Sequence, residues 1–104
     1  VYDTEVFVPI IKGIKKIRGN TADFSDLSKT CVCLANAQGG VIIIGIEDGE
    51  TNPPVNQKID QVEINKTVSR LRSLCDSVAI VNPEKVTHKN GAEYFKFMGN
   101  WNYY

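Results

Sequence analysis

Apolar side chains recur at helical spacing between residues 23 and 38. The apolar positions step forward by three or four residues and comprise Phe24, Leu27, Cys31 and Leu34. Such a stripe forms one face of an amphipathic helix. Asp23 or Ser25 can accept a hydrogen bond from the first backbone N–H groups, and Gly39 can end the helix in the left-handed conformation. We therefore predict a helix over residues 23–38.

A second helical stripe follows residue 60. Its apolar members are Ile64, Val68, Leu71, Cys75 and Val78. Asp60 and Glu63 match a capping box, with an acceptor at the cap and a glutamate three residues later. These positions predict an amphipathic helix of about five turns that continues to Val78.

Two segments have the short apolar patterns of strands. Residues 6–10 alternate around Pro9, which lacks a backbone donor, so we expect a short edge strand that leads into a loop. Residues 41–46 are apolar on both faces and lie between glycines. That pattern is typical of a central strand covered by helices on one side or both.

The last third of the chain predicts a β-hairpin. Pro83 is expected to end any regular secondary structure before it. Residues 86–88 and 92–98 then form two strands that turn at Asn90-Gly91. Strand, helix, strand, helix and hairpin together predict an α+β fold, with a sheet of about four strands and two helices on one face. Residues 1–104 are expected to be a single domain of a longer protein.

The composition narrows the possible functions. Twelve basic residues balance twelve acidic ones, so the chain is not a strongly basic domain of the kind that binds nucleic acid by net charge. No apolar run is longer than five residues, which predicts no membrane span, and no signal segment is recognisable. Three cysteines and one histidine favour buried, reduced thiols in a cytoplasmic protein and indicate neither a metal site nor another cofactor.

Local positive charge nevertheless gathers near the start of the chain. The basic residues there lie within seven positions with no acid among them, and are Lys12, Lys15, Lys16 and Arg18. They are either phosphate contacts or part of a solvated loop. Lys66 and Arg70 share a helix face and could extend the patch. Asn36 and Gln38, next to Gly39-Gly40, are either polar contacts to phosphates and base edges or parts of a helix end.

Acidic and aromatic side chains supply the remaining candidates. Glu47 and Asp48 could bind a metal ion or simply form a turn with Gly49, and strand alternation would point them to opposite faces. His88 is expected to be an exposed turn residue. Among the aromatic residues, Phe95 and Phe97 share one face and Tyr94 the other, so at least one set should be core.

The segment from Leu34 to Gly49 reads LANAQGG, VIII, then GIEDG. It resembles the AlbA-like DNA-binding domain of the Schlafen family, which shows an AxANxxGG helix end, a strand and a GVDD-G turn. A loop, a second long helix, an Asn-Pro and a hairpin at Asn-Gly follow in the same order, so the resemblance covers residues 24–98. It implies nucleic-acid binding, to DNA before RNA, in bacterial proteins regarded as transcriptional regulators or ATP-binding proteins.

Some animal members of that family are RNA endonucleases with three acidic residues, two in an N-terminal E…EFK strand and one in the GVDD turn. Here the matching candidates are Glu5, Glu47 and Asp48, and a second glutamate is missing at the family spacing. The resemblance therefore implies a non-catalytic nucleic-acid-binding module, with a metal-dependent nuclease as the alternative.

A third hypothesis is a protein-interaction or dimerisation module that forms a homodimer through the aromatic tail 101–104. The nucleic-acid-binding residues expected for the first hypothesis are Lys12, Lys15, Lys16, Arg18, Asn36 and Gln38.

Overall fold

The computed structural model describes residues 9–36, 39–75 and 78–101, and the side chains of residues 36 and 101 lie outside that description. The elements in chain order are β1 (Ile10–Lys12), the 3-10 turns η1 (Ile14–Ile17) and η2 (Gly19–Thr21), α1 (Phe24–Asn36), β2 (Gly40–Ile44), α2 (Gln61–Leu74), β3 (Val78–Thr87) and β4 (Glu93–Trp101).

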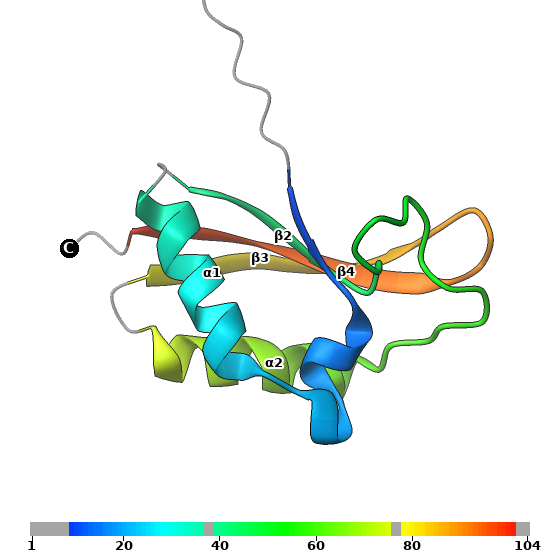
Figure 1. The fold of residues 1–104 in the computed structure, drawn as a ribbon, viewed down its shortest axis with the longest axis horizontal. Helices are drawn as coiled ribbons and strands as arrows, with labels where there is room; N and C mark the ends of the chain where they lie inside the picture. The colour runs from blue at the N-terminus through cyan, green and yellow to red at the C-terminus, as the bar shows by residue number, and fades with distance from the viewer. Residues whose placement is uncertain (1–8, 37–38, 76–77, 102–104) are drawn as a thin grey trace, which may run out of the picture.

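The four strands form one mixed sheet in the order β1-β2-β4-β3. β1 runs parallel to β2, whereas β4 is antiparallel to both of its neighbours. Both helices pack on the same face of this sheet (Figure 1). The arrangement confirms the predicted α+β class and the central position of the strand after Gly-Gly. The edge strand is Ile10–Lys12 and not residues 6–10 as expected, and residues 6–8 of that prediction lie outside the described residues.

The core lies between the sheet and the two helices. Ile42 pairs with Phe97 and Ile44 with Phe95 across β2 and β4, and all four side chains are fully buried. The helices contribute Leu27, Cys31, Ile64 and Leu71 to the same cluster. Val41, Ile43 and Met98 point to the other face and are only half buried, so β2 is covered by helices on one side.

The second helix is shorter than its apolar stripe predicts. α2 begins after Asp60, whose side chain accepts from the N–H of Val62, and it ends at Leu74 with Cys75 as the C-cap. The expectation that the helix continues to Val78 is wrong. Val78 begins β3 instead, where it is buried opposite Trp101, and β-branched residues suit that pleated surface.

The expectation that Pro83 ends the regular secondary structure is wrong. β3 runs through it, because β3 is an edge strand and its pairing with β4 shifts register between Val81 and Glu84. Asn82 takes a positive φ of 56° at this bulge. A proline without an N–H is tolerated at such a bulge on an edge strand.

The hairpin at Asn90-Gly91 is confirmed. Gly91 has a φ of 87° and its N–H donates to the carbonyl of His88 at 2.8 Å. Asn90 fixes the loop with its side chain, which accepts from the N–H of Ala92 and donates to the carbonyl of Pro53. His88 belongs to this turn as expected, but it is half buried, so the expectation that it is exposed is wrong.

The basic segment, residues 12–18, is more ordered than the solvated loop that is one of its two interpretations from the sequence. η1 and η2 follow β1 directly, and Ile17 reaches the main core with 9% of its surface exposed. Ile14 packs against the same cluster. The three-residue spacing of these isoleucines places both on one side of the 3-10 turn, so the segment docks on the core and leaves its cations outside.

A candidate nucleic-acid interface at the edge strand

An open cleft of about 710 Å³ lies beside β1. β1 and β2 are parallel, so the residues that follow each strand meet at the same edge of the sheet. Gly13 and η1 come from the first strand, and the turn at Glu47-Asp48 comes from the second. The cleft is lined by Pro9, Ile10, Ile11, Lys12, Gly13, Lys15, Lys16, Glu47 and Asp48.

Glu47 forms one wall of the cleft. Its carboxylate occupies the space that a Cβ on Gly13 would fill, so glycine at this buried position lets the acid approach the backbone. One carboxylate oxygen lies 3.7 Å from Nζ of Lys15. Lys15 is the most exposed of the cleft lysines, with 64% of its side-chain surface accessible.

Lys12 and Lys16 share one carboxylate. Their Nζ atoms lie 3.5 and 3.2 Å from the same Oδ2 of Asp26, which comes from the first turn of α1. The hydrogen bond from Lys16 and the charge of Lys12 hold the pKa of Asp26 below its usual value. Asp26 therefore fastens the basic segment to α1 in its ionised form.

Arg18 is directed to α2 and not into the cleft. Its Nε and Nη2 bind the two carboxylate oxygens of Glu63 at 2.6 and 2.8 Å, and Nη2 also donates to the carbonyl of Lys58 at 2.8 Å. The hydrogen bond to Glu63 raises the pKa of Arg18. Glu63 thus binds Arg18 with both oxygens, in place of the second half of the expected capping box.

The four predicted phosphate contacts therefore each have a carboxylate partner. These partners lie on α1, in the turn after β2 and on α2. Local sequence could not reveal them, because they are separated from the lysines and the arginine by 10 to 45 positions. The basic patch of the sequence is, in the structure, a set of ion pairs, with Lys12, Lys15 and Lys16 at the cleft and Arg18 directed to α2.

Asn36 belongs to a different end of the sheet. Asn36 is the last residue of α1, ahead of β2, whereas Glu47 follows the far end of β2. In Figure 1 the C-terminal end of α1 lies on the left and η1 on the right. Gln38 and Glu5 lie outside the described residues. Gly39 has a φ of 96° and its N–H donates to the carbonyl of Leu34 at 2.7 Å, which confirms it as the residue that ends the helix.

Glu47 and Asp48 both line this cleft. Strand alternation does not apply, because β2 ends at Ile44 and Gly45 has a φ of 123°. In the described part of the chain, no three Asp, Glu, His or Cys side chains cluster closely enough to hold a metal ion.

A second hollow, of about 610 Å³, lies between η1 and α2. Ile17, Phe24 and Thr67 line it together with Lys66 and Arg70. The Arg70 guanidinium lies over the Phe24 ring, 5.8 Å from its centre. The sequence indicates that Lys66 and Arg70 share a helix face, but only the fold places that face beside the basic segment.

A helix that ends at Gly-Gly, a buried central strand and an acidic turn beside a lysine-lined cleft define a small α+β domain of the AlbA-like class. The family model described as Schlafen, AlbA_2 matches residues 12–98, so the chain belongs to this family. No curated protein and no solved structure matches the chain.

Family membership indicates a nucleic-acid-related function. The matched range begins at Lys12 and therefore includes the end of β1 and the whole basic segment, beyond the stretch that carries the sequence resemblance. Within the described ranges, none of the helices is long and apolar enough to cross a membrane.

Proposed function

We propose that this domain is a non-catalytic DNA-binding module of a cytoplasmic transcriptional regulator, and that the cleft beside β1 contacts the phosphate backbone. The observation that carries the proposal is the convergence of Lys12, Lys15 and Lys16 on one open hollow of about 710 Å³. DNA is proposed ahead of RNA because of the AlbA-like resemblance. Arg18 has a supporting role, since two of its three guanidinium nitrogens, Nε and Nη2, are already bound to Glu63.

The ion pairs of the cleft do not prevent phosphate binding. The lysine–carboxylate distances are 3.2 to 3.7 Å, and the carboxylates of Asp26 and Glu47 are 39% and 37% exposed. Pairs of this kind contribute about 0 to 1 kcal/mol, so a phosphodiester can replace a carboxylate partner at small cost. Glu47 and Asp48 repel phosphate, which limits the affinity that this cleft can supply alone.

The test is fluorescence anisotropy with labelled duplex DNA, single-stranded DNA and RNA at two salt concentrations. We expect binding that weakens steeply with salt and is reduced about ten-fold in K15Q/K16Q, because two phosphate contacts are lost. K85Q/K89Q is the matched control, since it removes two charges from the β3–β4 hairpin and one partly buried ion pair, between Lys85 and Glu93. Absence of binding at low salt, or equal losses in both variants, would refute the proposal.

The same samples test the alternatives that the sequence raises. Cleavage of labelled RNA that requires magnesium or manganese and disappears in Asp48→Ala would replace the non-catalytic proposal with a nuclease. The homodimer stays a prediction, which light scattering of the full chain checks across a range of concentrations.

A further inference from the structure

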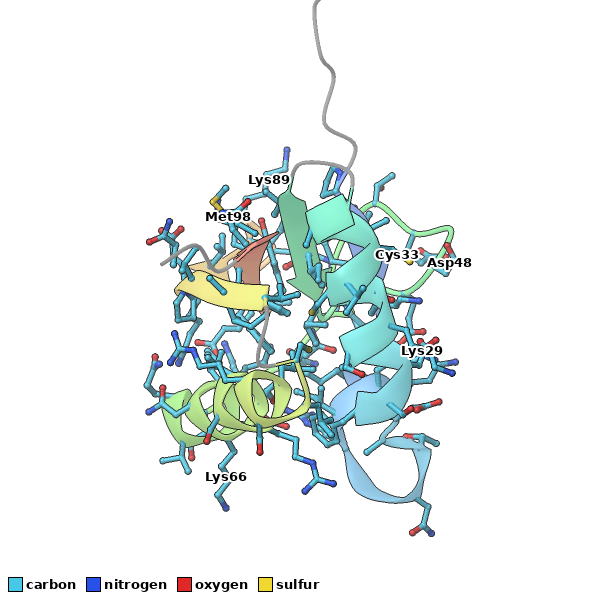
Figure 2. All side chains as sticks on the ribbon, turned by 90° about the vertical axis from the view of Figure 1, so that its left-hand side faces the viewer. Lys29, Cys33, Asp48, Lys66, Lys89 and Met98 are labelled. Atoms are coloured by element: carbon cyan, nitrogen blue, oxygen red, sulfur yellow. The ribbon has the colours of Figure 1, made fainter. Side chains whose placement is uncertain are left out.

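The outer face of α2 carries positive charge that the fold leaves available. Lys66 and Arg70 lie one helical turn apart on this face, and in the described residues no carboxylate lies within ion-pair distance of either. This contrasts with the cleft beside β1, where each lysine is paired. Figure 2 shows Lys66 projecting from α2 away from the sheet.

Along the outer groove of α2, the residues around these two cations are uncharged. A groove of about 460 Å³ runs along the helix and is lined by Val62, Asn65, Lys66, Ser69, Arg70 and Ser73, with no acid among them. Residues three apart lie next to each other on a helix, so Ser69 lies beside Lys66 and Ser73 beside Arg70. Hydroxyl and amide groups commonly donate hydrogen bonds to phosphate oxygens.

Arg70 is held in position before any ligand arrives. Its guanidinium lies over the Phe24 ring at the start of α1, which restricts the side chain while leaving its N–H groups on the surface. The hollow lined by Ile17, Phe24, Lys66 and Arg70 joins this face to η1. Asp60 and Glu63 also line the hollow, but Asp60 caps α2 and Glu63 binds Arg18.

We propose that the outer face of α2 is a second phosphate-binding surface, on which Lys66 and Arg70 contact the backbone of the same nucleic acid that enters the cleft beside β1. Asn65, Ser69 and Ser73 donate to the flanking phosphate oxygens. The inference rests on the proposed function and extends it: the balanced cleft positions the ligand, and α2 supplies the uncompensated charge. An acidic protein segment is the competing occupant, but it would lack the regular phosphate spacing that suits a row of donors.

The test compares the salt dependence of DNA binding in the wild-type chain, K66Q/R70Q and the control K85Q/K89Q. Each lost phosphate contact lowers the slope of log affinity against log salt by about 0.9, so K66Q/R70Q should be shallower by about 2. Between about 50 and about 200 mM salt, the wild type should therefore lose about ten-fold more affinity than this variant. Glutamine keeps most of the side-chain length, and thermal melts establish that each variant folds.

The outcomes separate this inference from the proposed function. Wild-type binding with an unchanged slope in K66Q/R70Q would overturn the α2 surface and leave the cleft in place. No wild-type binding would overturn both. A labelled poly-glutamate that binds more tightly than DNA, and loses that binding in K66Q/R70Q, would assign the face to an acidic protein partner instead.

Discussion

At the scale of single residues, Asp26 connects the charge of the cleft to the stability of the fold. Its folded-state pKa lies below the unfolded value of 3.8, first because Lys16 donates a hydrogen bond and then because of the charge of Lys12. The stabilisation is fully present above the unfolded pKa and fades as the pH falls through the folded value. We predict that Asp26→Asn loses less stability than the wild type between about pH 4 and about pH 2, in thermal melts.

Glu50→Gln is the control for this substitution, because Glu50 is exposed and donates only its backbone N–H, to the carbonyl of Glu47. The melting temperature of Glu50→Gln should fall with decreasing pH in the same way as that of the wild type. An equal fall of the melting temperature with decreasing pH in the wild type and both variants would contradict the role of Asp26. A second readout is DNA affinity, which should rise more in Asp26→Asn than in Glu50→Gln because Lys12 and Lys16 lose their shared partner.

Cysteine chemistry also depends on position. Burial first, and then the neighbouring Cys75, raise the pKa of the Cys31 thiol to about 12. The expectation of buried thiols is confirmed for Cys31 and Cys75 and is wrong for Cys33, which is exposed. Cys31 and Cys33 lie two positions apart on α1, and they differ because Cys31 faces the core and Cys33 faces the solvent.

At the scale of elements, the hydrophobic periodicity predicted which faces of the helices and strands are buried. Alternation in β4 predicts that Phe95 and Phe97 share a face, and both are fully buried with their rings 6.3 Å apart. The stripe at Phe24, Leu27 and Cys31 likewise predicts which side of α1 packs on the sheet. Where the pattern failed, the competing cause was tertiary: Val78 left the helix for a strand, and Pro83 was accommodated by an edge bulge.

The two faces of β4 should differ in their contribution to stability. Phe97→Ala removes a fully buried ring and is expected to cost about 3 to 5 kcal/mol of unfolding free energy, measured in urea. Met98→Ala, on the half-buried face, should cost markedly less. If Phe97→Ala does not fold, Phe97→Leu should still lose more stability than Met98→Ala. Equal losses at the two positions would contradict the one-sided core.

At the scale of the whole molecule, the candidate site was only partly predictable. The sequence showed which residues carry charge, but the compensating acids come from distant elements: Asp26 on α1, Glu47 after β2 and Glu63 on α2. A neutral net charge is compatible with a binding surface only if the charges are unevenly distributed. The fold achieves this by pairing the cleft lysines with acids while leaving Lys66 and Arg70 unpaired within the described part of the chain.

The Arg18–Glu63 pair joins the two proposed surfaces, and its contribution can be measured. Because the contact is bidentate and Glu63 is only 23% exposed, we expect a coupling energy of about 1 kcal/mol in a double-mutant cycle of R18Q and E63Q. Hydrogen exchange should quicken at the amides of Lys16, Arg18 and Ala22, whose bonds close η1 and η2, while the sheet stays protected. Lys15→Gln, which removes the longer 3.7 Å pair with Glu47, should have a smaller effect. Additive losses with unchanged exchange would mean that the Arg18–Glu63 pair does not hold η1 and η2 in place, and would contradict its role in joining the two surfaces.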